Sequence, residues 1–127
     1  MTGRLGRLAR RTLEPLAELI SLKGKKALIT GSAAGIGKAM AYRFAEAGAD
    51  LQLVDLNEEG LALVKEALSH FGQGIETYQV DLSRKEEVDN LWAGLSGKEP
   101  DILVNNAGVY PFKNFLEVDD AFLKKVM

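Results

Sequence analysis

The chain has 127 residues, 46% of them hydrophobic and 27% charged, a composition that fits one globular domain and argues against a disordered or collagen-like chain. Its net charge of −2 predicts no general attraction to nucleic acid, and no apolar run approaches the roughly 18 residues that would cross a bilayer. The absence of cysteine excludes a disulfide framework, a thiolate metal site and a thiol nucleophile. Because it is also compatible with a reducing compartment, we expect a cytoplasmic protein.

The first predicted element, residues 1–21, is an amphipathic basic arm. At 100° per residue, its apolar side chains lie on the face opposite its four arginines. The apolar set is Leu5, Leu8, Ala9, Leu13, Leu16, Leu19 and Ile20, and the arginines are Arg4, Arg7, Arg10 and Arg11. Pro15 predicts a kink, or a second short helix that begins near it. We expect the arm to pack on its own domain or on a neighbouring subunit of a homo-oligomer, with an interfacial membrane anchor or a targeting peptide as alternatives.

From Lys25 onward, strand-like apolar runs alternate with helical patterns, which is typical of βαβ units and a parallel sheet. The predicted strands are 25–30, 49–55, 75–81 and 101–106, and the predicted helices are 36–47, 58–70 and 84–95, with a last helical start near Val118. Right-handed crossovers then order the strands 3-2-1-4, the first half of a Rossmann-type doubly wound α/β sheet.

Residues that cap helices mark several of these boundaries. Asn57 precedes two acidic residues and is expected to cap the second helix, and Ser83 with Glu86 forms a capping-box pattern at the third. Gly48 and Gly72 stand where glycines end helices.

Three glycines follow the first predicted strand in "TGSAAGIG", residues 30–37. A phosphate must approach the backbone closely at a helix N-terminus, where unpaired N–H groups and the helix dipole supply positive potential. Gly31 allows the sharp turn out of the strand, Gly35 the approach of a pyrophosphate, and Gly37 close packing of the helix on the sheet. Ile36 is expected to fill the core beside them. Asp55, 18 residues after Gly37, ends the next strand, where an acid can hold the hydroxyls of a ribose.

With "DLS" at 81–83 and "NNAG" at 105–108, these residues make residues 22–127 resemble the N-terminal, cofactor-binding half of the short-chain dehydrogenase/reductase family. The resemblance implies that Asp81 and Leu82 contact the adenine, and that the "NNAG" segment lines the adenine ribose and braces the sheet. The expected cofactor-binding residues are therefore Gly31, Ser32, Gly35, Ile36, Gly37, Asp55, Leu56, Asp81, Leu82, Asn105, Asn106, Ala107 and Gly108.

Charge near Asp55 indicates which nicotinamide cofactor is bound. A 2′-phosphate beside this acid would be repelled unless a basic residue cancelled its charge. Ala34 and Leu56 stand at the two places where family members that prefer the phosphorylated cofactor carry such a residue. We therefore expect NAD(H) to be favoured over NADP(H).

The catalytic residues that the resemblance implies are not found in this sequence. The family's hydride transfer uses a tyrosine with a lysine four residues later, together with a serine and an asparagine. Four residues after Tyr42, Tyr78 and Tyr110 stand Glu46, Leu82 and Asn114. We expect this chain to be a truncated part of a dehydrogenase that acts on a small-molecule alcohol or carbonyl substrate, without catalytic residues of its own.

The alternative is a non-catalytic nucleotide-binding module or pseudoenzyme that works at this length. We favour the oxidoreductase, because the last predicted strand would otherwise leave an apolar edge unpaired. No metal site is expected, because Asp119 and Asp120 have no histidine or third carboxylate at the spacing of metal ligands.

Overall fold

The structure is a computed structural model that describes residues 15–108 and 121 of the chain. Four parallel strands form its sheet: β1 Lys26–Thr30, β2 Asp50–Asp55, β3 Ile75–Gln79 and β4 Ile102–Val104. Their order, β3-β2-β1-β4, confirms the predicted order 3-2-1-4 and the first half of a Rossmann-type sheet. Crossovers connect each of these strands to the next, so all four carboxyl ends meet at one edge of the sheet.

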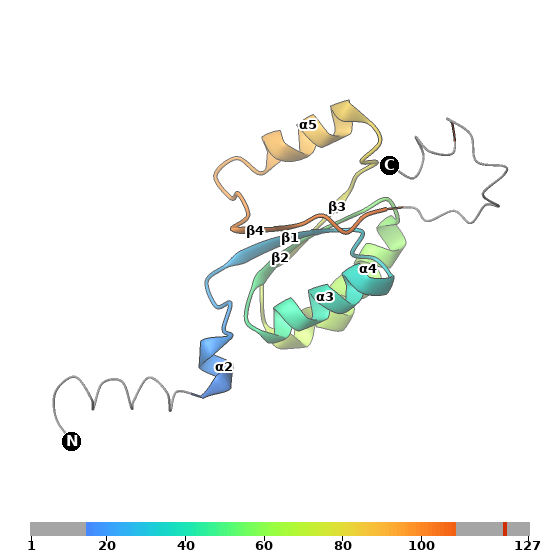
Figure 1. The fold of residues 1–127 in the computed structure, drawn as a ribbon. Coiled ribbons are helices and arrows are strands. Elements are labelled where there is room, and N and C mark those ends of the chain that lie inside the picture. Colours follow the sequence, from blue (N-terminus) through green and yellow to red (C-terminus); the bar gives the residue numbers. More distant parts are fainter. Residues whose placement is uncertain (1–14, 109–120, 122–127) are drawn as a thin grey trace, which may run out of the picture.

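The helices cover the two faces of the sheet unequally (Figure 1). Two of them, α3 Gly35–Glu46 and α4 Glu58–Leu68, lie on one face, and α5 Lys85–Gly94 lies on the other. A short 3₁₀ turn, η1 Ser69–Phe71, completes the second predicted helix. The predicted helices therefore agree with the structure to within two residues at each end, and the helical start expected near Val118 lies outside the described residues.

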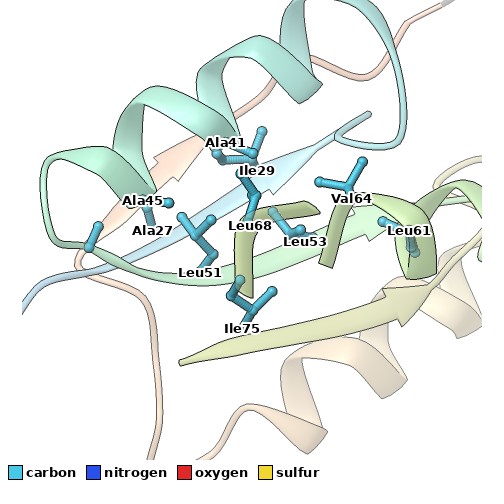
Figure 2. Close-up of a cluster of buried hydrophobic side chains, with 11 residues drawn as sticks. Ala27, Ile29, Ala41, Ala45, Leu51, Leu53, Leu61, Val64, Leu68 and Ile75 are labelled. Carbon is cyan, nitrogen blue, oxygen red and sulfur yellow. The ribbon is translucent and has the colours of Figure 1, made fainter. Parts of the chain in front are cut away.

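The alternation of side chains along the strands divides the core in two. On β1, Ala27 and Ile29 point to the α3 and α4 side, whereas Leu28 points to the α5 side. The larger cluster, drawn in Figure 2, comprises Ala27, Ile29, Ala41, Ala45, Ala49, Leu51, Leu53, Leu61, Val64, Leu68 and Ile75. The smaller one comprises Leu28, Val54, Val80, Leu91 and Leu95. These apolar contacts hold the helices on the sheet, because a half-buried helix gains most of its stability from its packed face.

Most predicted helix ends are confirmed, but one is wrong. The Asn57 side chain accepts the Gly60 N–H at 3.0 Å, and Gly48 and Gly72 both have positive φ. The capping box of Ser83 and Glu86 does not form: α5 begins one residue later, and the Ser83 hydroxyl donates to Asp81 Oδ1 at 2.6 Å. The Ser83 hydroxyl therefore forms a local hydrogen bond within the turn and does not cap the helix.

The described end of the arm stands apart from the sheet. A short helix, α2 Leu16–Leu19, begins directly after Pro15, which confirms the predicted second helix there. All its side chains are exposed, so this part of the arm does not pack on its own domain. The expectation of a neighbouring subunit stays a prediction, and residues 1–14 lie outside the described part. Within that part, no helix combines the length and the apolar character that crossing a membrane requires.

Candidate functional site

Every residue predicted to bind a cofactor lies at the carboxyl edge of the sheet. Residues 31–37 follow β1, residue 55 ends β2 and residue 56 follows it, residues 81 and 82 follow β3, and residues 105–108 follow β4. Since the strands are parallel, these four segments of distant sequence meet along one edge. Open parallel sheets bind their ligands at this edge, where the strand order reverses between β1 and β4.

The first and third glycines of the loop are required by close packing. Gly31 has φ +69°, and a Cβ added there would lie 2.9 Å from the Ala107 Cα. A Cβ on Gly37 would lie 2.1 Å from the Gly31 carbonyl oxygen and 2.6 Å from Asn106 Nδ2. Both predicted roles, the sharp turn and the tight helix packing, are therefore confirmed by the geometry.

The second glycine faces open space. Gly35 has φ +58°, and a Cβ added there would meet nothing within 4 Å. No side chain caps the N-terminus of α3, since its N-cap residue is Ala34. Backbone N–H groups with no side-chain partner, at the positive end of a helix dipole and beside open space, fit an anionic phosphate group.

The expected burial of Ile36 is wrong. Its side chain is 73% exposed, because the neighbouring Gly37 is the position of the first helical turn that faces the sheet. Leu56 and Leu82 are exposed at the same edge. Three of the residues predicted to contact the cofactor are therefore exposed apolar side chains at the carboxyl edge of the sheet.

Asp55 links the glycine-rich loop to the turn that follows β2. Its Oδ2 accepts the Ala33 N–H at 3.0 Å, and its Oδ1 accepts the Asn57 N–H at 2.9 Å. The side chain forms no ion pair with any residue between 15 and 108. Because each carboxylate oxygen has two lone pairs, the group still has acceptor capacity for a hydroxyl.

Asp81 is held ionised by its own turn. The Ser83 hydroxyl and then the Ser83 N–H, both bonded to Oδ1, lower the pKa of the Asp81 carboxyl below its ordinary value. The Asp81 N–H in turn donates to Glu87 Oε1 at 3.1 Å. The turn after β3 is thereby tied to the first turn of α5.

Thr30, which sequence reasoning did not assign to the site, joins the loop after β4 to the end of β1. Its Oγ1 accepts the N–H groups of Asn106 and Ala107, both at 3.0 Å. The Asn106 amide returns two bonds, to the carbonyl oxygens of Thr30 at 3.2 Å and Gly31 at 3.3 Å. Asn105, Ala107 and Gly108 are exposed beside this junction.

Gly60 is a second residue that sequence reasoning missed. A Cβ added there would lie 2.9 Å from the Ala33 Cβ, so α4 touches the glycine-rich loop. The signal was present in the sequence. A glycine in the first turns of a helix costs stability, so its presence there indicates that another part of the chain approaches it closely.

Two of the three tyrosines lie in the described region, and neither is placed for proton transfer at this edge. Tyr42 packs edge-on against Phe71, with ring centroids 5.2 Å apart. Tyr78 donates a hydrogen bond to Glu76, and burial followed by that bond raises the pKa of its phenol. Tyr78 therefore stays protonated and engaged, and Tyr110 lies outside the described residues.

Several known proteins are similar to this chain in sequence and in fold. A 3β-hydroxysteroid dehydrogenase 2 of Eggerthella lenta is 40% identical over 111 residues, which cover 84% of this chain and 42% of that protein. An L-sorbose reductase from Gluconobacter frateurii, complexed with NADPH and L-sorbose, is 35% identical with a TM-score of 0.73, over 80% of this chain and 40% of that one. A carveol dehydrogenase from Mycobacterium avium in complex with NAD is 28% identical, also with a TM-score of 0.73, over 83% of this chain and 43% of that one.

The chain thus spans about two fifths of the length of the relatives it matches. Over residues 25–127 it matches the family described as short chain dehydrogenase. The relatives that it matches are oxidoreductases. The glycine-rich loop, the acid at the end of β2 and the "NNAG" junction all lie inside this match. With most of its length matched, the chain belongs to the short-chain dehydrogenase family.

Proposed function

We propose that this chain is the NAD(H)-binding portion of an oxidoreductase that transfers hydride between a nicotinamide cofactor and a small-molecule alcohol or carbonyl. The observation that carries the proposal is the uncapped N-terminus of α3, open at Gly35, with the Asp55 carboxylate beside the loop that leads to it. When bound, the nicotinamide supplies or accepts the hydride. The residues of this chain bind and orient the cofactor's adenosine and phosphate groups.

The preference for NAD(H) follows from charge at the end of β2. A 2′-phosphate carries about two negative charges, which the Asp55 carboxylate would repel. No basic residue stands at either of the two positions that could neutralise this phosphate. Ala34 precedes Gly35 in the loop, and Leu56 follows Asp55. A ribose with free hydroxyls instead donates hydrogen bonds to the same carboxylate.

Titration of the folded chain with both cofactors tests this preference. We expect NAD(H) to bind more tightly than NADP(H) by about 1–3 kcal/mol, the range for one uncompensated charged contact. Replacing Asp55 with Ala should narrow the gap, because it removes the repulsion and the hydroxyl acceptor together. As a control, Asp89→Ala removes an exposed acid on α5 and should leave the gap unchanged. Equal or reversed affinities in the unmodified chain would contradict the assignment.

A second candidate, a nucleotide-binding module without catalysis, is favoured by one observation. No tyrosine in the sequence has a lysine four residues after it. Turnover by a longer form that carries such a pair supports the oxidoreductase, whereas a longer form that binds NAD(H) without turnover supports the module.

We also propose a cytoplasmic homo-oligomer, to which the exposed apolar face of α2 contributes an interface.

A further inference from the structure

The glycine-rich loop is attached to the end of β2 before it reaches α3. The Val54 carbonyl oxygen accepts the Gly31 N–H at 2.8 Å, the Ser32 N–H at 3.3 Å and the Ser32 hydroxyl at 3.4 Å. The next residue, Ala33, donates its N–H to the Asp55 carboxylate at 3.0 Å. Ala34 and Gly35 then complete the loop at the helix N-terminus. Ala33 is therefore the last point at which β2 holds the loop.

The Asp55 carboxylate bridges two segments that are separate in sequence. One oxygen receives the Ala33 N–H of the loop, and the other receives the Asn57 N–H of the turn into α4. Hydrogen bonds to an ionised acceptor are among the stronger ones in proteins, and this carboxylate is half-buried. The position of the loop is thus coupled to the position of the β2–α4 turn.

Gly60 makes the second contact with Ala33. Its missing Cβ leaves room for the Ala33 methyl group, which would lie only 2.9 Å from an added Cβ. The Ala33 methyl group has no rotamer by which to move aside. A larger residue at 60 would also place its Cβ 2.9 Å from the Nδ2 of Asn57, so it would press on both the glycine-rich loop and the cap of α4. Ala33 is consequently held both by a hydrogen bond to Asp55 and by close packing against Gly60.

We propose that Asp55 and Gly60 act together as a clamp on Ala33, and that this clamp positions the glycine-rich loop for the phosphate groups of the cofactor. The inference rests on the proposed NAD(H) site. It gives Asp55 a positioning role that is separate from its contact with the adenine ribose. It also means that removing Asp55 to admit a 2′-phosphate should loosen the loop, which weakens phosphate binding for both cofactors.

Amide hydrogen exchange tests the clamp without any cofactor. In the unliganded chain, we expect the Ala33 N–H to be protected and to exchange faster in Asp55→Ala and in Gly60→Ala. Gly94→Ala is the matched control, because it adds the same Cβ to a helix at a place with nothing within 4 Å. An unchanged Ala33 exchange rate in both test variants would overturn the clamp.

Titration with two ligands separates the positioning role from the ribose contact. The first is NAD, and the second is an NAD analogue that lacks both hydroxyls of the adenine ribose. We expect Asp55→Ala to weaken the analogue about three- to tenfold, as loss of a charge-assisted hydrogen bond implies. Gly60→Ala should weaken both ligands by the same factor, because it leaves the carboxylate in place. If Asp55→Ala weakens NAD but not the analogue, Asp55 acts only on the ribose and the positioning role is wrong.

Failure of the proposed function gives a different result from failure of the clamp. If the unmodified chain binds neither NAD nor NADP, the proposed function is wrong, while the exchange rates still decide the clamp. If Asp55→Ala does not fold, Asp55→Asn replaces it. The asparagine keeps one oxygen acceptor and loses the charge, so faster exchange at Ala33 than in the unmodified chain supports the clamp, and an equal rate contradicts it.

Discussion

At the scale of single residues, two glycines of the same loop have opposite surroundings. Gly35 adopts a positive φ beside open space, so its requirement is conformational. Gly37 has no positive φ, yet an added Cβ would lie 2.1 Å from the Gly31 carbonyl oxygen. Its requirement is steric, because the loop crosses directly over the first turn of α3.

This contrast predicts the effect of Gly37→Ala. The new methyl group must displace both the Gly31 carbonyl and the Asn106 side chain. Overpacking of this kind costs about 1–3 kcal/mol. We expect chemical denaturation to show this loss in the free energy of unfolding. Gly94→Ala is the control and should be neutral or stabilising, since alanine favours a helix. A Gly37→Ala chain as stable as the unmodified one would contradict the steric explanation.

A second prediction at this scale concerns pH. The Ser83 hydroxyl is the main cause of the lowered pKa of Asp81, so Ser83→Ala should raise that pKa toward the ordinary value of about 3.9. Because the pKa is lower in the folded state, the turn's contribution to stability is present above about pH 4 and is lost as the pH falls through the folded pKa.

An NMR titration of the Asp81 carboxyl carbon measures this shift directly. In Ser83→Ala, the midpoint should move up, and the contribution to stability above about pH 4 should become smaller, because the folded and unfolded pKa values lie closer together. Ser69→Ala serves as the control, because the Ser69 hydroxyl donates to the Glu66 carbonyl and not to an acid. An unmoved Asp81 midpoint in Ser83→Ala would assign the lowered pKa to another cause.

At the scale of elements, Thr30 joins the end of β1 to the loop that follows β4. One hydroxyl oxygen accepts two backbone N–H groups, from Asn106 and Ala107, and its proton is directed at the Val104 carbonyl oxygen at 3.3 Å. The two strands are neighbours, with Ala27 paired to Ile102. The backbone hydrogen bonds between β1 and β4 end with the strands. Beyond that point, the Thr30 hydroxyl holds the loop after β4 against the end of β1.

Replacing Thr30 with Val keeps the shape of the side chain and removes the acceptor. Two part-buried hydrogen bonds to backbone N–H groups are lost, and each such bond contributes about 0.5–1.5 kcal/mol to stability. We expect a lower free energy of unfolding and faster amide exchange at Asn106 and Ala107. Thr77→Val is the matched control on β3, because Thr77 makes no side-chain hydrogen bond within the described region. Equal effects of the two substitutions would show that the junction depends on packing alone.

At the scale of the whole molecule, β4 is the exposed edge of the sheet. It pairs with β1 on one side, and no strand between residues 15 and 108 pairs with it on the other. Its Leu103 is 47% exposed, and Ile102 and Val104 are only half-buried. An apolar edge strand of this kind is a template for pairing with another strand.

We expect the 127-residue chain alone to bind NAD(H) weakly and to show no dehydrogenase turnover. Hydride transfer to or from an alcohol requires a positioned proton donor or acceptor, and this chain has no tyrosine with a lysine four residues later. Adding a segment that pairs a strand along β4 and supplies a tyrosine with a lysine four residues later should give turnover.

Steady-state assays with a panel of alcohols and carbonyls, with and without the added fragment, measure this. The control is the same fragment assayed without the chain, which should be inactive because it lacks the glycine-rich loop. Robust turnover by the chain alone would contradict the prediction, and it would also contradict the conclusion that Tyr42 and Tyr78 are not placed for proton transfer.

The amino-acid sequence by itself determined the strand order, the helix positions and the loop glycines. Each depends on residues that are close in the chain: alternating apolar runs, a cap such as Asn57 before its helix, and a glycine between a strand and a helix. The handedness of the crossovers restricts the possible strand orders, and the glycine-rich loop after the first strand favours the Rossmann order 3-2-1-4 among them. The turn at Gly31 was predictable for the same reason, and so was the close packing at Gly37, whose added Cβ would meet the carbonyl oxygen of Gly31 in the same loop.

The tertiary structure alone decided what the loops contact. Thr30 and Asn106 are 76 positions apart, and Ala33 and Asp55 are 22 apart, so no local pattern shows that they are bonded. The exposure of Ile36 depended on which side of the first turn of α3 faces the sheet. Gly60 required the approach of a loop from another element. Such contacts arise only when packing brings distant segments together, because short-range sequence patterns carry the period of a helix or strand and not the identity of its partner.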